Sequence, residues 1–348
     1  MNSPEIIKYV RMLIRGEKPD EQIGDLLLDH RCTFLASKLK NVEYEQEMKL
    51  NQTLNSIAIK ERYKACKPIF DTIDVPYAII KGAVLSNSAY KNPFIRFSGD
   101  VDFLVNRKDV DSLKKLLISN GFIQGRIINN SIVPFSRREI LFQASQTHQT
   151  APFIKQTGNR LCPFVNIDVN MDVMWGECEE KADMDFVLSH TEKISLLNSS
   201  FYKLTSEMEF VSLCLHHYKD MNSLYLLSNG SLKLNLFCDI YFYLLNCHPD
   251  PQTLLDICRR LNVGRYIYVC IYHTFLIFDD PTLTEYLNIL DTEKDASLYD
   301  TLGLNNKERK DWNLSLFDRL FHPDLPQYVN SLLSVEEKEK IRLNQINM

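Results

Sequence analysis

The chain has 348 residues, of which 45% are hydrophobic, and its formal net charge at pH 7 is −5. The length exceeds that of one average domain, and the apolar content is ample for a sizeable core. The negative charge makes nucleic acid an unexpected partner, because a general nucleic-acid binder needs a basic surface, and no apolar run is long enough to span a bilayer.

Residues 1–75 predict an N-terminal helical segment. Apolar residues recur at helical spacing near the start of the chain and again from 43 to 73. The second helix should end before Pro76, because the residue that precedes a proline avoids the α region. The first 22 residues meet charged side chains too early for a signal peptide, so we expect a cytoplasmic protein with no membrane partner.

Residues 77–105 place a Lys-Gly turn ahead of two carboxylates. A short apolar strand at 77–80 leads into Lys81 and Gly82, and a helix is expected over 83–90. A glycine at a strand-to-helix turn lets the backbone come close to a phosphate, and the start of a helix directs N–H groups at the anion. The turn therefore predicts a phosphate-binding element.

Asp100 and Asp102 are two residues apart on a predicted strand, so both side chains leave the same face. Val101, Phe103 and Val105 then point into the core. Two adjacent carboxylates repel each other and are costly to desolvate, so such a pair usually holds a cation, and Mg²⁺ fits best. An isolated Asp-x-Asp is more often a solvated strand end, but the turn upstream favours a metal-dependent phosphoryl or nucleotidyl transfer site.

Arg96 lies between the turn and the two carboxylates. It has two possible roles: it contacts a triphosphate, or it pairs with Asp100 as basic residues near acids often do. The sequence favours neither role.

A third carboxylate is needed to activate the acceptor or to complete a two-metal site. Residues 163–175 alternate between apolar and polar side chains, and this pattern predicts a strand with Asp168 and Asp172 on its polar face. An antiparallel strand with its polar face in water would show the same pattern. Beside Gly82 and the Asp pair, we favour the catalytic interpretation.

From about residue 185 the chain is expected to be helical again, and its nine singly placed cysteines predict reduced core thiols rather than disulfides or zinc ligands. We therefore expect an α+β fold with a small mixed-sheet core and helical regions on both sides in the sequence. The predicted divisions are an N-terminal helical segment, an α/β core and a C-terminal helical domain, at residues 1–75, 76–182 and 183–348.

The order of these motifs resembles the nucleotidyltransferase superfamily of the DNA polymerase beta type. Within it, the chain is similar to the uncharacterised nucleotidyltransferases of the NTP transferase 5 kind, from the long helix before residue 77 to about residue 279. The residues that carry the resemblance are Lys81-Gly82, Arg96, Asp100, Asp102, Leu104, Val105 and Asp172-Val173-Met174-Trp175.

The resemblance implies a Mg²⁺-dependent enzyme that moves an NMP group from a nucleoside triphosphate to a hydroxyl or phosphate acceptor and releases pyrophosphate. Asp100 and Asp102 would hold the metal, and Asp172 would complete the metal set and orient or deprotonate the acceptor, with Asp168 as the alternative. The residues expected to bind the nucleotide are Lys81, Gly82, Ala83, Arg96 and Ser98.

The acceptor is expected to be a small molecule or a peptide. Its pocket would include His148, His217, Lys219 and Asp239, which lie in segments that the resemblance covers. Asp239 stands in an apolar helical run and needs a partner, which His217 or Lys219 would supply either structurally or within the pocket. Of His216 and His217, which point in different directions, at most one should face the pocket.

Two departures from the superfamily pattern keep other functions open. Ala83 stands where the superfamily usually has serine or glycine, so a hydroxyl for the phosphate is missing, and Met174 replaces a histidine. One alternative is therefore a catalytically degenerate nucleotide-binding or interaction protein with the same fold. Another is a toxin-type nucleotidyltransferase that acts on protein or RNA.

Overall fold

The computed structural model describes residues 2–18, 23–39, 42–146, 148–176, 178 and 180–347. Two compact units make up the chain: a sheet unit, Gln52–Ser212, and a helical unit, Met1–Asn51 with Leu213–Met348. The boundaries between them fall inside two helices, α4 (Val42–Thr72) and α9 (Ser206–Asn222). The expected α+β class is confirmed: along the sequence, helical segments precede and follow the strands of a mixed sheet.

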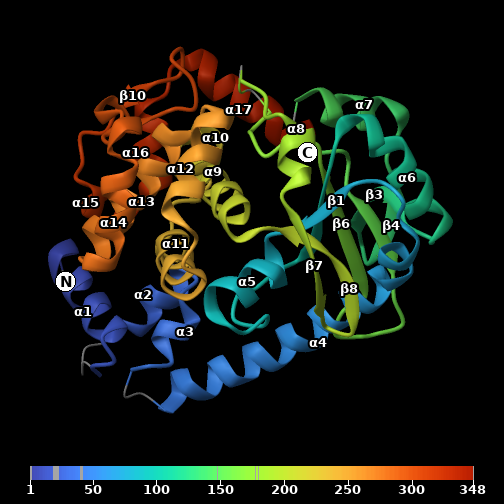
Figure 1. Cartoon of the computed structure of the whole chain (residues 1–348), viewed down its shortest axis with the longest axis horizontal. Helices are drawn as coiled ribbons and strands as arrows, with labels where there is room; N and C mark the ends of the chain where they lie inside the picture. The colour runs from blue at the N-terminus through green and yellow to red at the C-terminus, as the bar shows by residue number, and fades with distance from the viewer. Residues whose placement is uncertain are drawn as a thin grey trace. The chain divides into compact units, whose positions relative to one another are not determined.

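The sheet unit contains a mixed sheet whose strands lie in the order β4-β3-β5-β6-β2-β1-β8-β7 (Figure 1). Its strands are β1 (Tyr77–Ile80), β2 (Asp100–Val105), β3 (Ile123–Ile128), β4 (Ser131–Pro134), β5 (Phe153–Gln156), β6 (Phe164–Asn170), β7 (Thr191–Leu196) and β8 (Ser199–Leu204). The helices of this unit, besides its parts of α4 and α9, are α5 (Gly82–Tyr90), α6 (Val110–Ser119), α7 (Arg137–Gln146) and α8 (Met184–Ser189).

One face of strand β2 is part of the hydrophobic core, as its alternation predicts. Val101, Phe103 and Val105 are at most 2% exposed and lie in the same cluster as Phe70 of α4. The ring centroids of Phe70 and Phe103 are 5.7 Å apart. Fully burying a side chain of this size contributes about 1.5–3 kcal/mol. This packing fixes which face of β2 is apolar, so the side chains of Asp100 and Asp102 must leave the other face.

The strand register sets which residues stand beside these carboxylates. β2 pairs with β6 in parallel, and Asp102 lies directly opposite Asp168. β2 also pairs with β1 in the antiparallel sense, and there Asp102 is opposite Ile80, the residue before Lys81. Paired residues of adjacent strands project from the same face. Register alone therefore brings Asp168 and the Lys81 turn to Asp102.

The helical unit is built around apolar helices, with α11 and α13 packed against each other. Its longer helices, besides its parts of α4 and α9, are α1 (Ser3–Ile14), α11 (Leu234–Cys247), α12 (Pro251–Leu261), α13 (Gly264–Phe278), α16 (Leu325–Leu332) and α17 (Val335–Asn347). Its shorter elements are α2 (Gly24–Asp29), α3 (Thr33–Ala36), α10 (Leu224–Leu227), α14 (Thr284–Ile289), α15 (Leu316–Leu320), β9 (Thr301–Leu302) and β10 (Lys310–Asp311).

Helix α1 is joined to the end of α13 by one arginine. The Nε and one terminal nitrogen of Arg11 each donate a 2.8 Å hydrogen bond, to the carbonyls of Ile277 and Leu276. The last carbonyls of a helix have no partner within the helix, so a cation there satisfies them and offsets the negative end of the helix dipole. The N-terminal helix is therefore part of this unit's core.

Two expectations from the sequence were wrong. The strand predicted to run to Trp175 ends at Asn170, because the Asp172 carboxylate accepts hydrogen bonds from the backbone N–H groups of Met174 (2.9 Å) and Ala182 (3.4 Å) and so stabilises a turn.

The region after residue 185 is also not wholly helical, because β7 and β8 form an antiparallel hairpin there. Leu197 and Asn198 join these strands with φ of 54° and 59°, the backbone that a two-residue hairpin needs. The division of the chain into 1–75, 76–182 and 183–348 stays a prediction.

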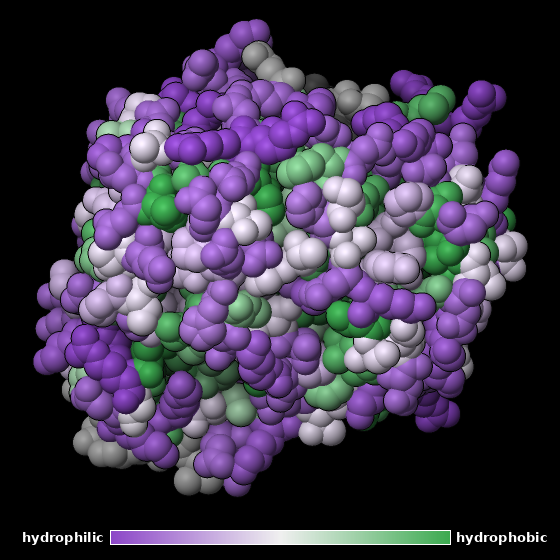
Figure 2. Space-filling model, in the orientation of Figure 1, coloured by the Kyte–Doolittle hydropathy of each residue, from purple (hydrophilic) through white to green (hydrophobic). Residues whose placement is uncertain are grey.

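Within the described part of the chain, none of the helices combines the length and the apolar composition needed to cross a membrane. The face of the molecule shown in Figure 2 is mainly hydrophilic, with small separate patches of hydrophobic residues. Scattered apolar residues of this kind are normal on a protein surface.

Candidate active site

The turn between β1 and α5 has an unusual backbone. Lys81 has φ 58° and ψ −151°, a region that non-glycine residues rarely occupy, and Gly82 follows with φ 45°. A Cβ at Gly82 would lie 2.8 Å from Ser98 Oγ, so no side chain fits there. Ser98 in turn donates a hydrogen bond to the Asp100 carbonyl (3.0 Å). Gly82 thus lets the turn after β1 and the start of β2 approach each other closely.

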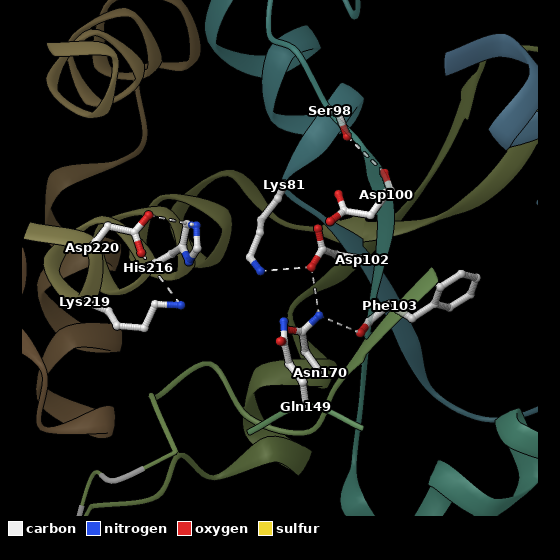
Figure 3. Close-up of polar contacts among 10 residues, drawn as sticks. All are labelled: Lys81, Ser98, Asp100, Asp102, Phe103, Gln149, Asn170, His216, Lys219 and Asp220. Atoms are coloured by element: carbon white, nitrogen blue, oxygen red, sulfur yellow. Dashed lines mark hydrogen bonds and ion pairs between the residues drawn. The ribbon is translucent and has the colours of Figure 1, made fainter. Parts of the chain in front are cut away.

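Asp102 is held by two donors (Figure 3). Lys81 Nζ and Asn170 Nδ2 lie 2.9 Å and 3.1 Å from the same oxygen, Asp102 Oδ1. Gln149 Nε2 then donates to Asn170 Oδ1 (2.8 Å). The Asp102 side chain is 5% exposed and that of Lys81 is 18% exposed, so the ion pair is largely shielded from water. Burial lowers the pKa of Lys81, but the charge and hydrogen bond of Asp102, together with the charges of Asp100 and Asp168, outweigh it, and the pKa is raised.

Asp100 and Asp168 are the two carboxyl groups of this face whose ionised forms are disfavoured. Burial and the charge of Asp102 raise the pKa of Asp100 from 3.8 to about 6. Burial, Asp102 and Asp100 raise the pKa of Asp168 from 3.8 to about 7, and Lys81 offsets only part of this effect. Three carboxyl groups therefore interact with one another, and the ammonium group of Lys81 acts on all three.

Asp172, which the sequence placed in the catalytic set, has different partners. Burial raises its pKa, and the backbone N–H groups of Met174 and Ala182 lower it. Its carboxylate therefore supports the turn after β6. Asp168, which the sequence left as the alternative, is the carboxylate that the strand register brings opposite Asp102. The geometry favours Asp168 over Asp172 as the third carboxylate.

Arg62 of α4 is a residue of the site that the sequence interpretation missed. It is 8% exposed, and one terminal nitrogen donates a 2.6 Å hydrogen bond to the Ser98 carbonyl. Its charge also lowers the pKa of Asp100. The signal was present in the sequence, because Arg62 follows Ile59 and precedes Cys66 on the buried stripe of a helix, where an arginine needs a partner.

The backbone of Arg96 is fixed on both sides. Its N–H donates to Ser86 Oγ (3.1 Å), and its carbonyl accepts from Asn55 Nδ2 (2.8 Å). The leading cations acting on the Asp100 pKa are Lys81 and Arg62. A role for Arg96 in triphosphate binding stays a prediction.

The residues after Gly82 offer no replacement for the missing hydroxyl at position 83. Ala83 is 2% exposed. Ser86 donates to the Asn92 carbonyl (2.7 Å), and Ser88 donates to the Glu209 carboxylate (2.8 Å). Both serines therefore stabilise the loop and helix of this unit.

His217 and Asp239, assigned to an acceptor pocket, form a buried pair in the helical unit. His217 Nε2 lies 3.1 Å from Asp239 Oδ2, and both side chains are 0% exposed. They have no surface with which to contact an acceptor in this structure, which favours the structural role that the sequence left open. Lys219, 19% exposed, lies 3.8 Å from Asp220.

His148, the fourth residue assigned to that pocket, lies in the sheet unit. Its carbonyl accepts a hydrogen bond from the Met171 N–H (2.8 Å), immediately after β6 ends. The next residue, Gln149, contacts Asn170, which contacts Asp102. Of the four residues assigned to the acceptor, His148 is therefore the one linked through the chain to the carboxylates.

The donor set of Asp100, Asp102 and Asp168 fits a hard divalent cation. Carboxylate oxygens are the ligands that Mg²⁺ prefers. Burial first, and the neighbouring carboxylates second, raise the pKa values of Asp100 and Asp168, and Lys81 lowers both only in part. A bound cation would lower both pKa values by favouring the ionised forms.

A family model described as uncharacterised nucleotidyltransferase matches residues 46–279, which is more than half of the chain. The matched region includes the Lys81-Gly82 turn and all three carboxylates. No curated protein and no solved structure matches the chain.

Proposed function

Because the chain belongs to this family of nucleotidyltransferases, we propose that it transfers an NMP group from a nucleoside triphosphate to a hydroxyl or phosphate of a small-molecule or peptide acceptor. The observation that carries the proposal is the convergence of Asp100, Asp102 and Asp168 on one face of the sheet beside a strained strand-to-helix turn. Each of these parts matches a requirement of the reaction.

Asp100 and Asp102 would hold Mg²⁺, and Asp168, as the third carboxylate, would complete the metal set. The ion, when bound, supplies positive charge that stabilises the charge developing on the phosphate oxygens. In the structure Lys81 contacts Asp102 Oδ1, the oxygen that a metal would also use. The ammonium group of Lys81 would therefore move to the triphosphate when metal and nucleotide bind.

The start of α5 would hold the phosphates. The first N–H groups of a helix have no partner within the helix and attract anions. No side-chain hydrogen bond caps this end of α5.

Asp168 would accept the proton of the acceptor. The acceptor oxygen attacks the α-phosphorus, its O–H proton passes to Asp168, and the bond from that phosphorus to the pyrophosphate oxygen breaks. A general base works best when its pKa is near the working pH, and the pKa of Asp168 is about 7. A bound metal would lower this value, so pH dependence has to be measured with Mg²⁺ present.

Calorimetric titration of ATP, GTP, CTP and UTP, each with and without Mg²⁺, tests this function. Wild-type protein should bind at least one of them in a Mg²⁺-dependent manner, and the Asp100→Asn, Asp102→Asn double variant should lose that binding. Both changes are close to isosteric, and circular dichroism would check that the fold is retained. Equal binding by both proteins, or no Mg²⁺ dependence, would contradict the assignment.

A further inference from the structure

Helix α9 places three potential metal ligands together in the helical unit. One ligand atom each from His216, His217 and Asp220 lies within 4.8 Å of the other two. His216 Nε2 is 3.5 Å from Asp220 Oδ2 (Figure 3). His216 and Asp220 are four residues apart, and residues at this spacing on a helix share a face, which explains their contact.

His217 carries an additional sign of a ligand. Its Nε2 is bonded to the carboxylate of Asp239, and its Nδ1 is buried with no hydrogen-bond partner. An ionised carboxylate can only accept, so Nε2 must carry the proton and donate it. In the neutral ring the lone pair then lies on Nδ1. A fully buried imidazole nitrogen with an unshared lone pair is suited to a metal, and metal-binding histidines commonly donate their other N–H to a carboxylate.

We propose that His216, His217 and Asp220 form a Zn²⁺ site and that Asp239 orients His217 for it. Two imidazoles and one carboxylate, with a fourth position open to water, are a ligand set that Zn²⁺ takes, whereas Mg²⁺ prefers oxygen ligands alone. Zn–ligand bonds of about 2.0–2.1 Å place tetrahedral ligands about 3.3–3.4 Å apart. The observed 3.5 Å between His216 and Asp220 already fits this separation.

The surroundings leave the site accessible to a cation. The side chains of His216 and Asp220 are 25% and 21% exposed, so a metal can enter from this side and small rotations can close the wider separations. Lys219 is the nearby positive charge, and its Nζ lies 3.8 Å from Asp220 Oδ1. His216 faces Asp220 Oδ2 instead, so the lysine does not occupy the oxygen proposed as the metal ligand.

This site is separate in its chemistry from the proposed nucleotidyl transfer. Its donors include imidazole nitrogens, and its ligands differ from the carboxylates of β2 and β6. A failure to observe Mg²⁺-dependent nucleotide binding would therefore not exclude Zn²⁺ binding, and a failure to observe Zn²⁺ binding would not exclude the proposed nucleotidyl transfer.

The test is a calorimetric titration of the full-length, tag-free, chelator-treated protein with ZnCl₂, and with MgCl₂ for comparison. Loss of a residue that only orients a ligand weakens metal binding by about 10–100-fold. We therefore expect His216→Ala and Asp220→Asn to weaken Zn²⁺ binding by at least about tenfold. Both positions are partly exposed, so these variants should fold, whereas a change at the buried His217 risks unfolding.

His248→Asn is the matched control. His248 is an exposed histidine of the same unit, outside the cluster, and it ends α11 with φ 45°. Asparagine tolerates this backbone, so the variant removes a histidine without strain. Its Zn²⁺ affinity should equal that of the wild type. Equal affinities in all four proteins would overturn the proposal.

Zinc bound through cysteines is the competing explanation, because Cys178 and Cys247 are half-buried free thiols. Titration with Co²⁺ separates the two cases. Imidazole and carboxylate ligands in a tetrahedral site give visible d–d absorption without a thiolate charge-transfer band. A strong near-ultraviolet charge-transfer band that persists in Asp220→Asn would assign the metal to thiols and overturn the proposal.

Discussion

The carboxylate face of the sheet and the His217–Asp239 pair of the helical unit both contain ionisable groups that are shielded from water. The two regions differ in the partners that these groups have. On the sheet, Lys81 and Arg62 act on the carboxylates, and the pKa values of Asp100 and Asp168 still stand well above 3.8. In the helical unit, one histidine faces one carboxylate and both are fully buried.

This difference indicates that the first region is suited to binding a cation and the second to stabilising the fold. A group of carboxylates that are hard to ionise destabilises the empty protein and is relieved by a cation, which is the behaviour expected of a site kept for binding. A fully buried pair such as His217 and Asp239 is different, because removing one partner leaves the other buried without a partner and destabilises the fold. The first region should therefore gain stability when one of its carboxylate charges is removed, and the second should lose stability when either partner is removed.

The largest effect is expected from breaking the buried pair. Asp239→Leu leaves His217 without its partner and should lower the free energy of unfolding by about 3–5 kcal/mol. Urea denaturation would measure the loss. The His217→Leu, Asp239→Leu double variant should lose less than the sum of the two single changes, because the pair is already absent after the first. Additive losses would show that the two side chains do not act together.

Removing Arg62 should have an intermediate effect. Arg62→Met leaves the Ser98 carbonyl without its donor and should cost about 1–3 kcal/mol. It also removes a positive charge beside Asp100, so the pKa of Asp100 should rise further and the pH dependence of Mg²⁺ binding should shift to higher pH. Arg62→Lys is the control, since it keeps the charge. If Arg62→Met left the stability and the pH dependence of Mg²⁺ binding unchanged, Arg62 would have no part in the site.

An effect of the opposite sign, which appears only as the pH rises, is expected at Asp168. Its pKa is about 7 in the folded protein against 3.8 when unfolded. The unfolded state therefore releases its proton first, so this group lowers stability progressively as pH rises from about 4 to about 7. Without metal, Asp168→Asn should be about 4 kcal/mol more stable than the wild type at pH 8, and the gain should vanish near pH 4.

Asp172→Asn is the contrast for that measurement. Asp172 accepts backbone hydrogen bonds that stabilise a turn, so the change should reduce stability at pH 8. Urea denaturation at pH 4 and pH 8 would measure both variants. A stabilising Asp172→Asn together with a destabilising Asp168→Asn would reverse the roles assigned to these two residues.

Local pattern was enough to predict the elements that carry Lys81, Asp100 and Asp102. The strand before Lys81, the glycine turn and the alternation around Asp100 and Asp102 all depend on residues close in sequence, and their strands and helix are confirmed within one residue. The third carboxylate depends on the register between β2 and β6, which are more than 60 residues apart. Asp168 and Asp172 share a face in the sequence pattern, so periodicity could not separate them.

The other omissions have the same origin. The contact of Arg62 with Ser98 joins α4 to the loop before β2, and the partner of His217 lies on a different helix. Each contact requires the tertiary packing. The sequence did show that Asp239 needed a partner, because a carboxylate in an apolar run is costly to bury, but it could not choose between His217 and Lys219.

The most direct test of Asp168 as the third carboxylate compares Asp168→Asn with Asp172→Asn for Mg²⁺-dependent binding of a nucleoside triphosphate. Calorimetry would measure the binding, with the nucleotide that the wild type binds. The account predicts that Asp168→Asn weakens the Mg²⁺-dependent part of binding by at least about tenfold, since it removes a charged metal ligand, and that Asp172→Asn retains it. Loss of Mg²⁺-dependent binding in Asp172→Asn, with Asp168→Asn unaffected, would contradict the assignment of the third carboxylate.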